Sequence, residues 1–464
     1  MPLKRADKTP MSERDAELRS HDFVEVNEGY NFARARFEAE RCLRCQDPVC
    51  IDGCPVRIPI PDFVHLIAAG DMAGAAKVLR SANPLPAICG RVCPQESQCE
   101  EQCSLGTRFV PVAIGYLERF VADWEMGQPA GEAPAQPTRA EKVAIIGSGP
   151  AGLVCAGELA RLGHPVTIYE GLHAAGGVLR YGIPEFRLPK KVLDWEIEQL
   201  KRLGVEIVCN VIVGKTLSMD DLFEKMGYSA VFVGTGAGLP QFMGIPGENL
   251  NGVYSANEFL TRVNLMHAND FPNADTPVMV GKRVAVIGAG NTAMDTVRTA
   301  LRVGAEKAMI VYRRSVAEMT ARVEEHHHAI EEGVEFHWLT NPVEILGNKD
   351  GWVTGLKCIS MELGEPDDSG RARPVPIEGS EFVLPVDNVV LSIGNRPNPL
   401  LLQTTKGLKS NKWGCLVVED ESAQTSLRHV FAGGDAVTGA ATVILAAGAG
   451  KSAAAAIHAD LCGE

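Results

Sequence analysis

The residues best suited to chemistry are cysteines gathered near the start of the chain. Eight of the thirteen cysteines lie within residues 42–103, in the patterns Cys-x2-Cys-x4-Cys-x3-Cys-Pro and Cys-x3-Cys-Pro-x4-Cys-x3-Cys. The N-terminal MPLKRADKTP lacks the apolar core of a secretory signal, so we expect a cytoplasmic protein with reduced thiols. Such a dense group of thiols indicates metal binding before disulfides. The eight are Cys42, Cys45, Cys50 and Cys54, then Cys89, Cys93, Cys99 and Cys103.

The spacing of these cysteines favours iron–sulfur clusters. A cubane cluster needs four ligands that converge on one small volume, and short loops supply two or three of them. The Cys54-Pro55 and Cys93-Pro94 steps resemble those of bacterial ferredoxins, where the last cysteine of a run binds the other cluster. Seven or eight thiolates suit two [4Fe–4S] clusters. Structural zinc is the alternative, but only Cys42 and Cys45 have the Cys-x2-Cys spacing that it prefers.

A dinucleotide-binding fingerprint follows a Pro/Gly/Ala-rich stretch at 126–140, which we interpret as a linker. The apolar strand 142–146 leads into Gly147-Ser-Gly149-Pro-Ala-Gly152, then a helical pattern and a second strand that ends at Glu170. Gly147 permits a tight turn, Gly149 lets the backbone approach a pyrophosphate, and Gly152 lets the helix pack closely. Glu170 would bind a ribose diol, and the helix N-terminus would face the phosphates.

The same pattern returns in the second half of the chain. The apolar strand 282–287 leads into Gly288-Ala-Gly290, and a helical pattern begins with Asn291 and Thr292. Alanine at the third glycine position is compatible with the fingerprint. The sequence therefore predicts a second dinucleotide site.

The two sites should prefer different nucleotides. The second strand of the second fold ends in Arg313 and Arg314, where the first fold has a carboxylate. Guanidinium groups suit a 2′-phosphate, which a carboxylate would repel. We therefore expect NADPH at the second site, held by both arginines, although a solvated basic turn is the alternative.

Two dinucleotide folds in one chain indicate a flavoprotein with FAD on the first. The C-terminal region agrees, because the strand 430–432 is followed by Gly433-Gly434-Asp435 and then by a helix that we expect to begin near Ala441. The dipole of that helix would favour the negative charge that reduction places on the flavin. The FAD contacts that we expect beyond the fingerprint are Gly177, Arg180, Gly434, Asp435, Thr442 and Val443.

A thiol relay for the flavin is missing from the sequence. No cysteine lies within residues 171–187, and Cys358 stands alone. The N-terminal clusters are therefore the expected route for electrons. A run of three histidines, His326 to His328, fits a solvated helix face better than a metal site, because adjacent helical residues point in different directions.

Length and charge indicate the number of domains and exclude some kinds of partner. The 464 residues suggest about three domains. A net charge of −13 argues against nucleic acid, and no long uncharged apolar run predicts a membrane span. We predict an α/β protein: a mostly helical iron–sulfur module, then two Rossmann-like domains with the NADPH domain inserted into the FAD domain. The predicted ranges are 1–125 for the module, 141–280 with 385–464 for FAD, and 281–384 for NADPH.

Together these stretches resemble the glutamate synthase small (beta) subunit family over nearly the whole chain. The module also resembles the N-terminal portion of dihydropyrimidine dehydrogenase. The run 177–189 is similar to one branch, which holds homotetrameric NADPH glutamate synthases and the large subunit of the bifurcating NADH-dependent ferredoxin:NADP oxidoreductase. The matching stretches are Cys89–Gln95, Ala144–Gly152, Gly288–Asp295 and Ala432–Asp435.

The resemblance also implies the ligands of each cluster. One cluster would be held by Cys42, Cys45, Cys50 and Cys103. The other, nearer the flavin, would be held by Cys54, Cys93, Cys99 and Glu118. Glu118 lies in an Ile-Gly-x-Leu-Glu segment, and Cys89 would then be a non-ligand. Counting cysteines alone would use all eight, so Cys89 in place of Glu118 stays open.

The hypothesis for function is electron transfer between NADPH, FAD and two [4Fe–4S] clusters, to or from a partner subunit. The partner would be a glutamate synthase large subunit, or a small flavoprotein or ferredoxin. No residue need act as a general acid or base. Glutamate formation itself would need the large subunit, because the chain has neither an N-terminal cysteine nucleophile nor a (β/α)8 pattern. The alternatives are the bifurcating large subunit and a non-catalytic zinc scaffold.

Overall fold

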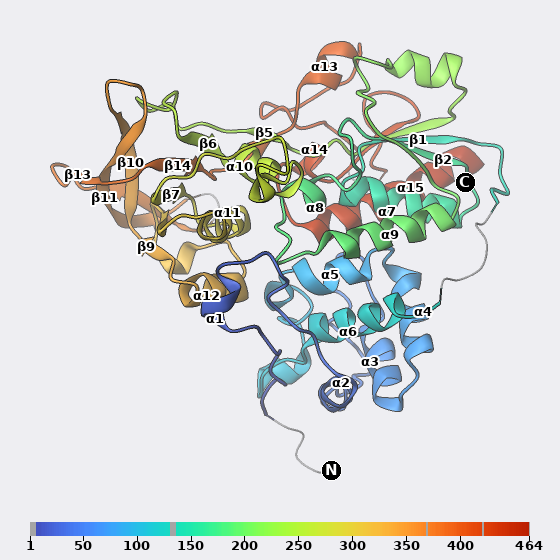
Figure 1. Cartoon of the computed structure of the whole chain (residues 1–464). Helices are drawn as coiled ribbons and strands as arrows, with labels where there is room; N and C mark the ends of the chain where they lie inside the picture. The colour runs from blue at the N-terminus through green and yellow to red at the C-terminus, as the bar shows by residue number, and fades with distance from the viewer. Residues whose placement is uncertain (1–5, 130–135, 368–369, 420–421, 464) are drawn as a thin grey trace.

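The chain forms three packed parts in the computed structural model, which describes residues 6–129, 136–367, 370–419 and 422–463. A helical module holds the N-terminal part of the chain, and two parallel sheets hold the rest (Figure 1). The predicted α/β class and helical N-terminal module are therefore confirmed. None of the helices in these ranges is both long enough and apolar enough to span a membrane.

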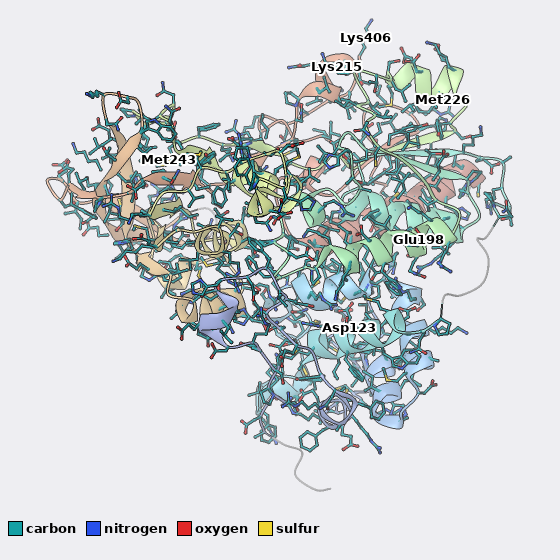
Figure 2. All side chains as sticks on the ribbon, in the orientation of Figure 1. Asp123, Glu198, Lys215, Met226, Met243 and Lys406 are labelled. Carbon is teal, nitrogen blue, oxygen red and sulfur yellow. The ribbon has the colours of Figure 1, made fainter. Side chains whose placement is uncertain are left out.

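Short helices and loops build the N-terminal module. Helix α3 begins directly after Pro59 and carries its own proline in the first turn, where a missing N–H costs nothing. The side chain of Asp71 accepts a hydrogen bond from the N–H of Gly74 and so caps α4. Asp123 of α6, labelled in Figure 2, pairs with Arg91 of α5. The helices are α1 (Ala16–Arg19), α2 (Phe32–Ala39), α3 (Ile60–Ala69), α4 (Met72–Ala82), α5 (Pro86–Val92) and α6 (Ile114–Met126). Helix α6 ends at the start of the predicted linker, of which 130–135 lie outside the described residues.

The first sheet is entirely parallel, in the order β16-β4-β1-β2-β3. Its central strands are apolar and fully buried, as expected for a sheet with helices on both faces. The strands are β1 (Val143–Ile146), β2 (Val166–Tyr169), β3 (Glu206–Val208), β4 (Ala230–Val233) and β16 (Val430–Ala432), and the helices beside them include α7 (Pro150–Arg161), α9 (Lys190–Arg202) and α15 (Val443–Cys462). Because β16 comes from the far end of the chain, this part is split, as predicted.

The second sheet, in the order β6-β14-β7-β8-β9, lies between β4 and β16 in the sequence, so the predicted insertion is confirmed. Its members are β6 (Val253–Ser255), β7 (Arg283–Ile287), β8 (Lys307–Val311), β9 (Glu335–His337) and β14 (Asn388–Leu391), with helices α10 (Ala256–Asn264), α11 (Asn291–Arg302) and α12 (Val323–Glu331). Strands β6 and β14 fall outside the predicted range 281–384. They belong here because β14 pairs with both β6 and β7, a long-range contact that local sequence cannot report.

Two smaller sheets complete the fold. The strands β5 (Leu239–Pro240) and β15 (Asn395–Arg396) pair antiparallel where the chain passes between the two parallel sheets. A second antiparallel group contains β10 (Thr340–Gly347), β11 (Val353–Pro366), β12 (Ala372–Pro376) and β13 (Phe382–Leu384). The remaining short helices are α8 (Val178–Tyr181), α13 (Leu400–Thr404) and α14 (Asp435–Thr438), with helical turns at 95–97, 104–107, 221–225, 268–270 and 316–318.

Candidate functional site

Four cysteines of the module, Cys42, Cys45, Cys50 and Cys103, are partly buried, and none of them forms a disulfide. Burial raises the pKa of the Cys50 thiol to about 12, and negative charge on Cys103, Cys42 and Cys45 would raise it further. Cys103, Cys42 and Cys45 therefore lie close enough to Cys50 to affect it electrostatically.

A second group forms deeper in the module. Burial raises the pKa of Cys54 to about 11, and the carboxyl of Glu118 and the thiol of Cys89 act in the same direction. Cys99 is affected by Cys54 and Glu118 as well, after burial and Glu100. The fold therefore places Glu118 among the thiols of the second group.

Glu118 is an unusual residue for such a position. It lies on α6 and is only 5% exposed. Burial raises the pKa of its carboxyl to about 8, and Asn83 donates one long hydrogen bond of 3.3 Å to it. A buried carboxyl with so little support is costly unless an ion or a further partner is present, so its surroundings suit a metal ligand.

Cys89 also lies beside the second group, on α5, and is almost fully buried. It shares a hydrogen bond with Cys93, and that contact together with burial raises the pKa of the Cys93 thiol. The positions of Cys89 and Glu118 therefore do not show which of the two would be the fourth ligand of the second cluster.

The cysteine groups do not have the geometry of a single-ion site. Tetrahedral zinc with bonds of about 2.3 Å would hold its four sulfurs within about 4 Å of one another. In the described ranges, no three cysteine sulfurs lie within 4.8 Å of one another. A multi-iron cluster spreads its ligands more widely, so the residues present fit clusters better than zinc.

The trio that meets this distance criterion within those ranges is Glu13, Glu324 and His328. Glu324 is already bound by Arg322, and Arg19 approaches Glu13. The positive charge of these guanidinium groups disfavours the binding of a cation there.

The prediction of a solvated helix face at 326–328 is wrong for His328. This residue is 3% exposed, and its Nε2 lies 3.1 Å from Glu13. It is buried because α1 packs against α12 (Figure 1), a contact between distant segments that the local charge pattern does not reveal.

A cavity of about 390 Å³ opens where the two parallel sheets and the module meet. The first glycine turn forms one wall. Gly147 has φ +100°, and a Cβ there would lie 2.5 Å from the carbonyl of Gly234. A Cβ at Gly149 would meet nothing within 4 Å, so its backbone faces open space. A Cβ at Gly152 would collide with the carbonyl of Gly147. This geometry matches the role expected of each glycine.

Glu170 lines the same cavity at the end of β2. Its carboxylate accepts hydrogen bonds from the N–H of Ser148 at 3.0 Å and the N–H of Leu172 at 2.8 Å, and from the Ser148 hydroxyl. These bonds hold the acid against the glycine turn.

Residues near the C-terminus form another part of the cavity wall. Asp435, Thr442 and Val443 line the cavity, and the Thr442 hydroxyl caps α15, which begins at Val443, near Ala441 as expected. Burial raises the pKa of Asp435 to about 6. Gly434 packs against Ala151 of α7 behind this wall.

The two remaining residues expected to contact FAD, Gly177 and Arg180, differ in their position relative to the cavity. Gly177 lines the cavity and packs against Gly149. Arg180 is absent from the cavity walls formed by the described residues. It pairs with Asp194 and donates to the carbonyl of Ala175.

The second glycine turn borders the cavity from the other sheet. Gly288 has φ +127°, and a Cβ there would collide with the carbonyl of Ser392. A Cβ at Gly290 would lie 3.4 Å from the Thr320 hydroxyl, and both Asn291 and Thr292 line the cavity. The cavity therefore reaches from one dinucleotide fold to the other.

The two arginines expected to bind a 2′-phosphate differ in their surroundings. Arg313 is exposed, with no hydrogen bond or ion pair to the described parts of the chain. Arg314 is 4% exposed, pairs with Asp367 at 2.5 Å and donates to the carbonyl of Ala372 at 2.9 Å. Arg314 therefore ties β8 to the β11–β12 hairpin, which leaves Arg313 as the available cation.

Several residues at the cavity were not among the site residues expected from the sequence, although they lie within the stretches that carry the family resemblance. Arg187 and Asp295 line it as an ion pair of 2.9 Å that joins the two nucleotide folds. Val92 and Pro94 also line it, on either side of Cys93. The second cysteine group thus adjoins the cavity wall.

Comparison with known proteins decides the family. Residues 19–130 match the model of dihydropyrimidine dehydrogenase domain II, 4Fe-4S cluster, and residues 141–457 match that of pyridine nucleotide-disulphide oxidoreductase. The glutamate synthase [NADPH] small chain of Escherichia coli is 38% identical over 94% of this chain and 93% of its own length. The chain belongs to the glutamate synthase small-chain family. It is an oxidoreductase with a 4Fe–4S domain and a pyridine-nucleotide domain.

Two further comparisons concern a longer relative and a solved structure. The beta subunit of the NADP(+)-dependent formate dehydrogenase of Moorella thermoacetica is 41% identical over 88% of this chain, which covers 59% of that subunit. Among solved structures, Mycobacterium tuberculosis FprA in complex with NADPH superposes with a TM-score of 0.58 at 21% identity, over 70% of this chain and 85% of FprA. The latter likeness concerns the fold.

Proposed function

We propose that this small-chain family member moves electrons between NADPH and a partner subunit through FAD and two [4Fe–4S] clusters. The observation that carries the proposal is the position of Cys93 between Val92 and Pro94, both of which line the cavity. A cluster ligand would then lie one residue from the wall of the flavin site. FAD, when bound, exchanges a hydride for single electrons.

Separate sets of residues would bind the two nucleotides. We propose that Gly147, Gly149 and Glu170 bind the adenosine and pyrophosphate of FAD, while Asp435 and the N-terminus of α15 face its flavin end. Gly288, Gly290 and Asn291 would bind the NADPH pyrophosphate. Arg313, exposed at the end of β8, would bind the 2′-phosphate. The open space at Gly149 supports this arrangement.

We further propose two clusters, one for each cysteine group. The first would use the four half-buried cysteines, and the second would use Cys54, Cys93, Cys99 and Glu118. The buried carboxyl of Glu118 supports its role, because iron would relieve the cost of its burial. An oxygen ligand would also shift the potential of that cluster.

Cluster content provides the first experiment. The protein, purified without oxygen, should contain about eight irons and eight acid-labile sulfides for each FAD. The variant Glu118→Ala should retain about four irons if Glu118 is a ligand, whereas Cys89→Ala should retain all eight. The opposite pattern would assign the fourth position to Cys89.

We propose a glutamate synthase large chain as the partner. The support is the similarity to a small chain, which accounts for nearly the whole length of both proteins. Affinity purification of the tagged protein from its native cells, followed by mass spectrometry, tests the assignment. A large glutaminase-containing chain in stoichiometric amount is expected, whereas a stoichiometric dehydrogenase chain or small flavoprotein would replace this proposal.

A further inference from the structure

Lys451 lies where α15 crosses from the cavity to the helical module. The helix begins at the cavity with Val443, and Ala446 also lines the wall. One turn further on, the helix packs on the Cys54–Pro55 step, since a Cβ at Gly448 would lie 2.9 Å from the Pro55 carbonyl. Lys451 is therefore carried by an element that touches both the cavity and the second cysteine group.

The ammonium of Lys451 holds the loop that contains Cys54. Its Nζ donates a hydrogen bond of 3.0 Å to the carbonyl of Val56. The backbone of Ile58 and Val56 lies close enough to the Cys54 thiol to lower its pKa, against the larger effect of burial. Lys451 thus fixes the loop whose backbone surrounds this sulfur.

The same ammonium also holds the segment that supports Glu118. Lys451 donates a hydrogen bond of 2.8 Å to the carbonyl of Ala82, the last residue of α4. A cation suits this position, because carbonyls at a helix C-terminus lack partners. The next residue, Asn83, donates to Glu118. One side chain therefore joins the Cys54 loop to the partner of Glu118.

Lys451 carries a charge opposite to that of the groups that most affect Cys54. The charged groups that most affect Cys54 in the described structure are Glu118 and Cys89, both negative when ionised. Lys451 interacts electrostatically with Cys54 with the opposite sign. A [4Fe–4S] cluster gains negative charge on reduction, and its potential depends on net charge and hydrogen bonds.

We propose that Lys451 is a positioning residue that fixes the cluster next to the flavin cavity and raises its reduction potential. This inference rests on the proposed function, because it requires a cluster at Cys54, Cys93 and Cys99. It adds a residue from the flavin-binding part of the chain that tunes a cluster in the helical module.

The test is an anaerobic redox titration of the whole protein, followed by electron paramagnetic resonance. Lys451→Gln removes the charge but keeps a donor, and Lys451→Arg keeps both. Lys77→Gln, at an exposed position on α4, is the matched control. In K451Q, the ratio of reduced to oxidised cluster at a fixed potential should fall about tenfold, which is about 59 mV for one electron. K451R and K77Q should stay within about twofold of wild type.

Each outcome bears on the proposal. A K451Q protein that titrates like K77Q would overturn it, and so would a K451R protein that shifts as far as K451Q. A loss of about four irons in K451Q, with K451R fully loaded, would support the positioning role. Failure of the proposed function has a different signature, because wild-type protein would then lack the second cluster altogether.

Discussion

Removal of the Arg313 side chain should separate the use of NADPH from that of NADH. Arg313 is the exposed member of the arginine pair and would bind the 2′-phosphate that NADH lacks. A hydrogen bond between charged groups contributes about 1.5–3 kcal/mol, and exposure to salt water favours the lower end. About 1.5 kcal/mol corresponds to roughly a tenfold rise in KM for NADPH in Arg313→Ala. The KM for NADH should stay within about twofold.

Steady-state reduction of an artificial acceptor, with each nucleotide in turn, measures this ratio. Arg428→Ala removes another exposed arginine, which lies two residues before β16 of the first parallel sheet, and serves as the control. Arg314→Ala should mainly lower thermal stability, because Arg314 is held by Asp367. Equal rises in KM for both nucleotides in R313A would refute the phosphate role. A larger specificity change in R314A would assign that role to Arg314.

Five further substitutions test FAD binding and a buried ion-pair network. Glu170→Gln should weaken FAD retention during gel filtration, and a changed NADPH/NADH ratio would contradict its assignment to the first nucleotide. Gly149→Ala should leave the melting temperature of FAD-free protein unchanged but impair FAD binding, since its Cβ has room only in the cavity, whereas Gly152→Ala should destabilise the fold itself. Glu332→Gln should cost about 3–5 kcal/mol in the free energy of unfolding, because this buried carboxylate pairs with three arginines. Glu331→Gln, at a half-exposed position, should cost about 1 kcal/mol or less, and equal costs for the two variants would argue against the buried network.

Local patterns predicted the two nucleotide turns well. The strand, turn and helix from Val143 to Arg161 follow from apolar runs and from glycines whose roles are set within a few residues. The backbone at Gly147 and the open space at Gly149 match those expectations. The assignment of the cysteines to two clusters came from the family resemblance and stays a prediction.

Contacts between distant segments explain what the sequence did not predict. Arg314 is engaged by Asp367 across a hairpin, and His328 is buried by the N-terminal segment, so neither environment has a local signature. Strand β6 joins the second sheet through β14, more than 130 residues away in sequence. Lys451 reaches a module that precedes it by several hundred residues. Each of these depends on which surfaces meet after folding.

Iron and acid-labile sulfide, counted in oxygen-protected protein together with FAD, test the central claim most directly. Electron transfer through the wall at Cys93 requires a cluster in each cysteine group. We predict about eight irons and eight sulfides for each FAD, and bleaching of both the flavin and the iron–sulfur absorbance when NADPH is added. A protein with bound zinc and no sulfide, or one whose iron–sulfur absorbance does not respond to NADPH, would contradict the account.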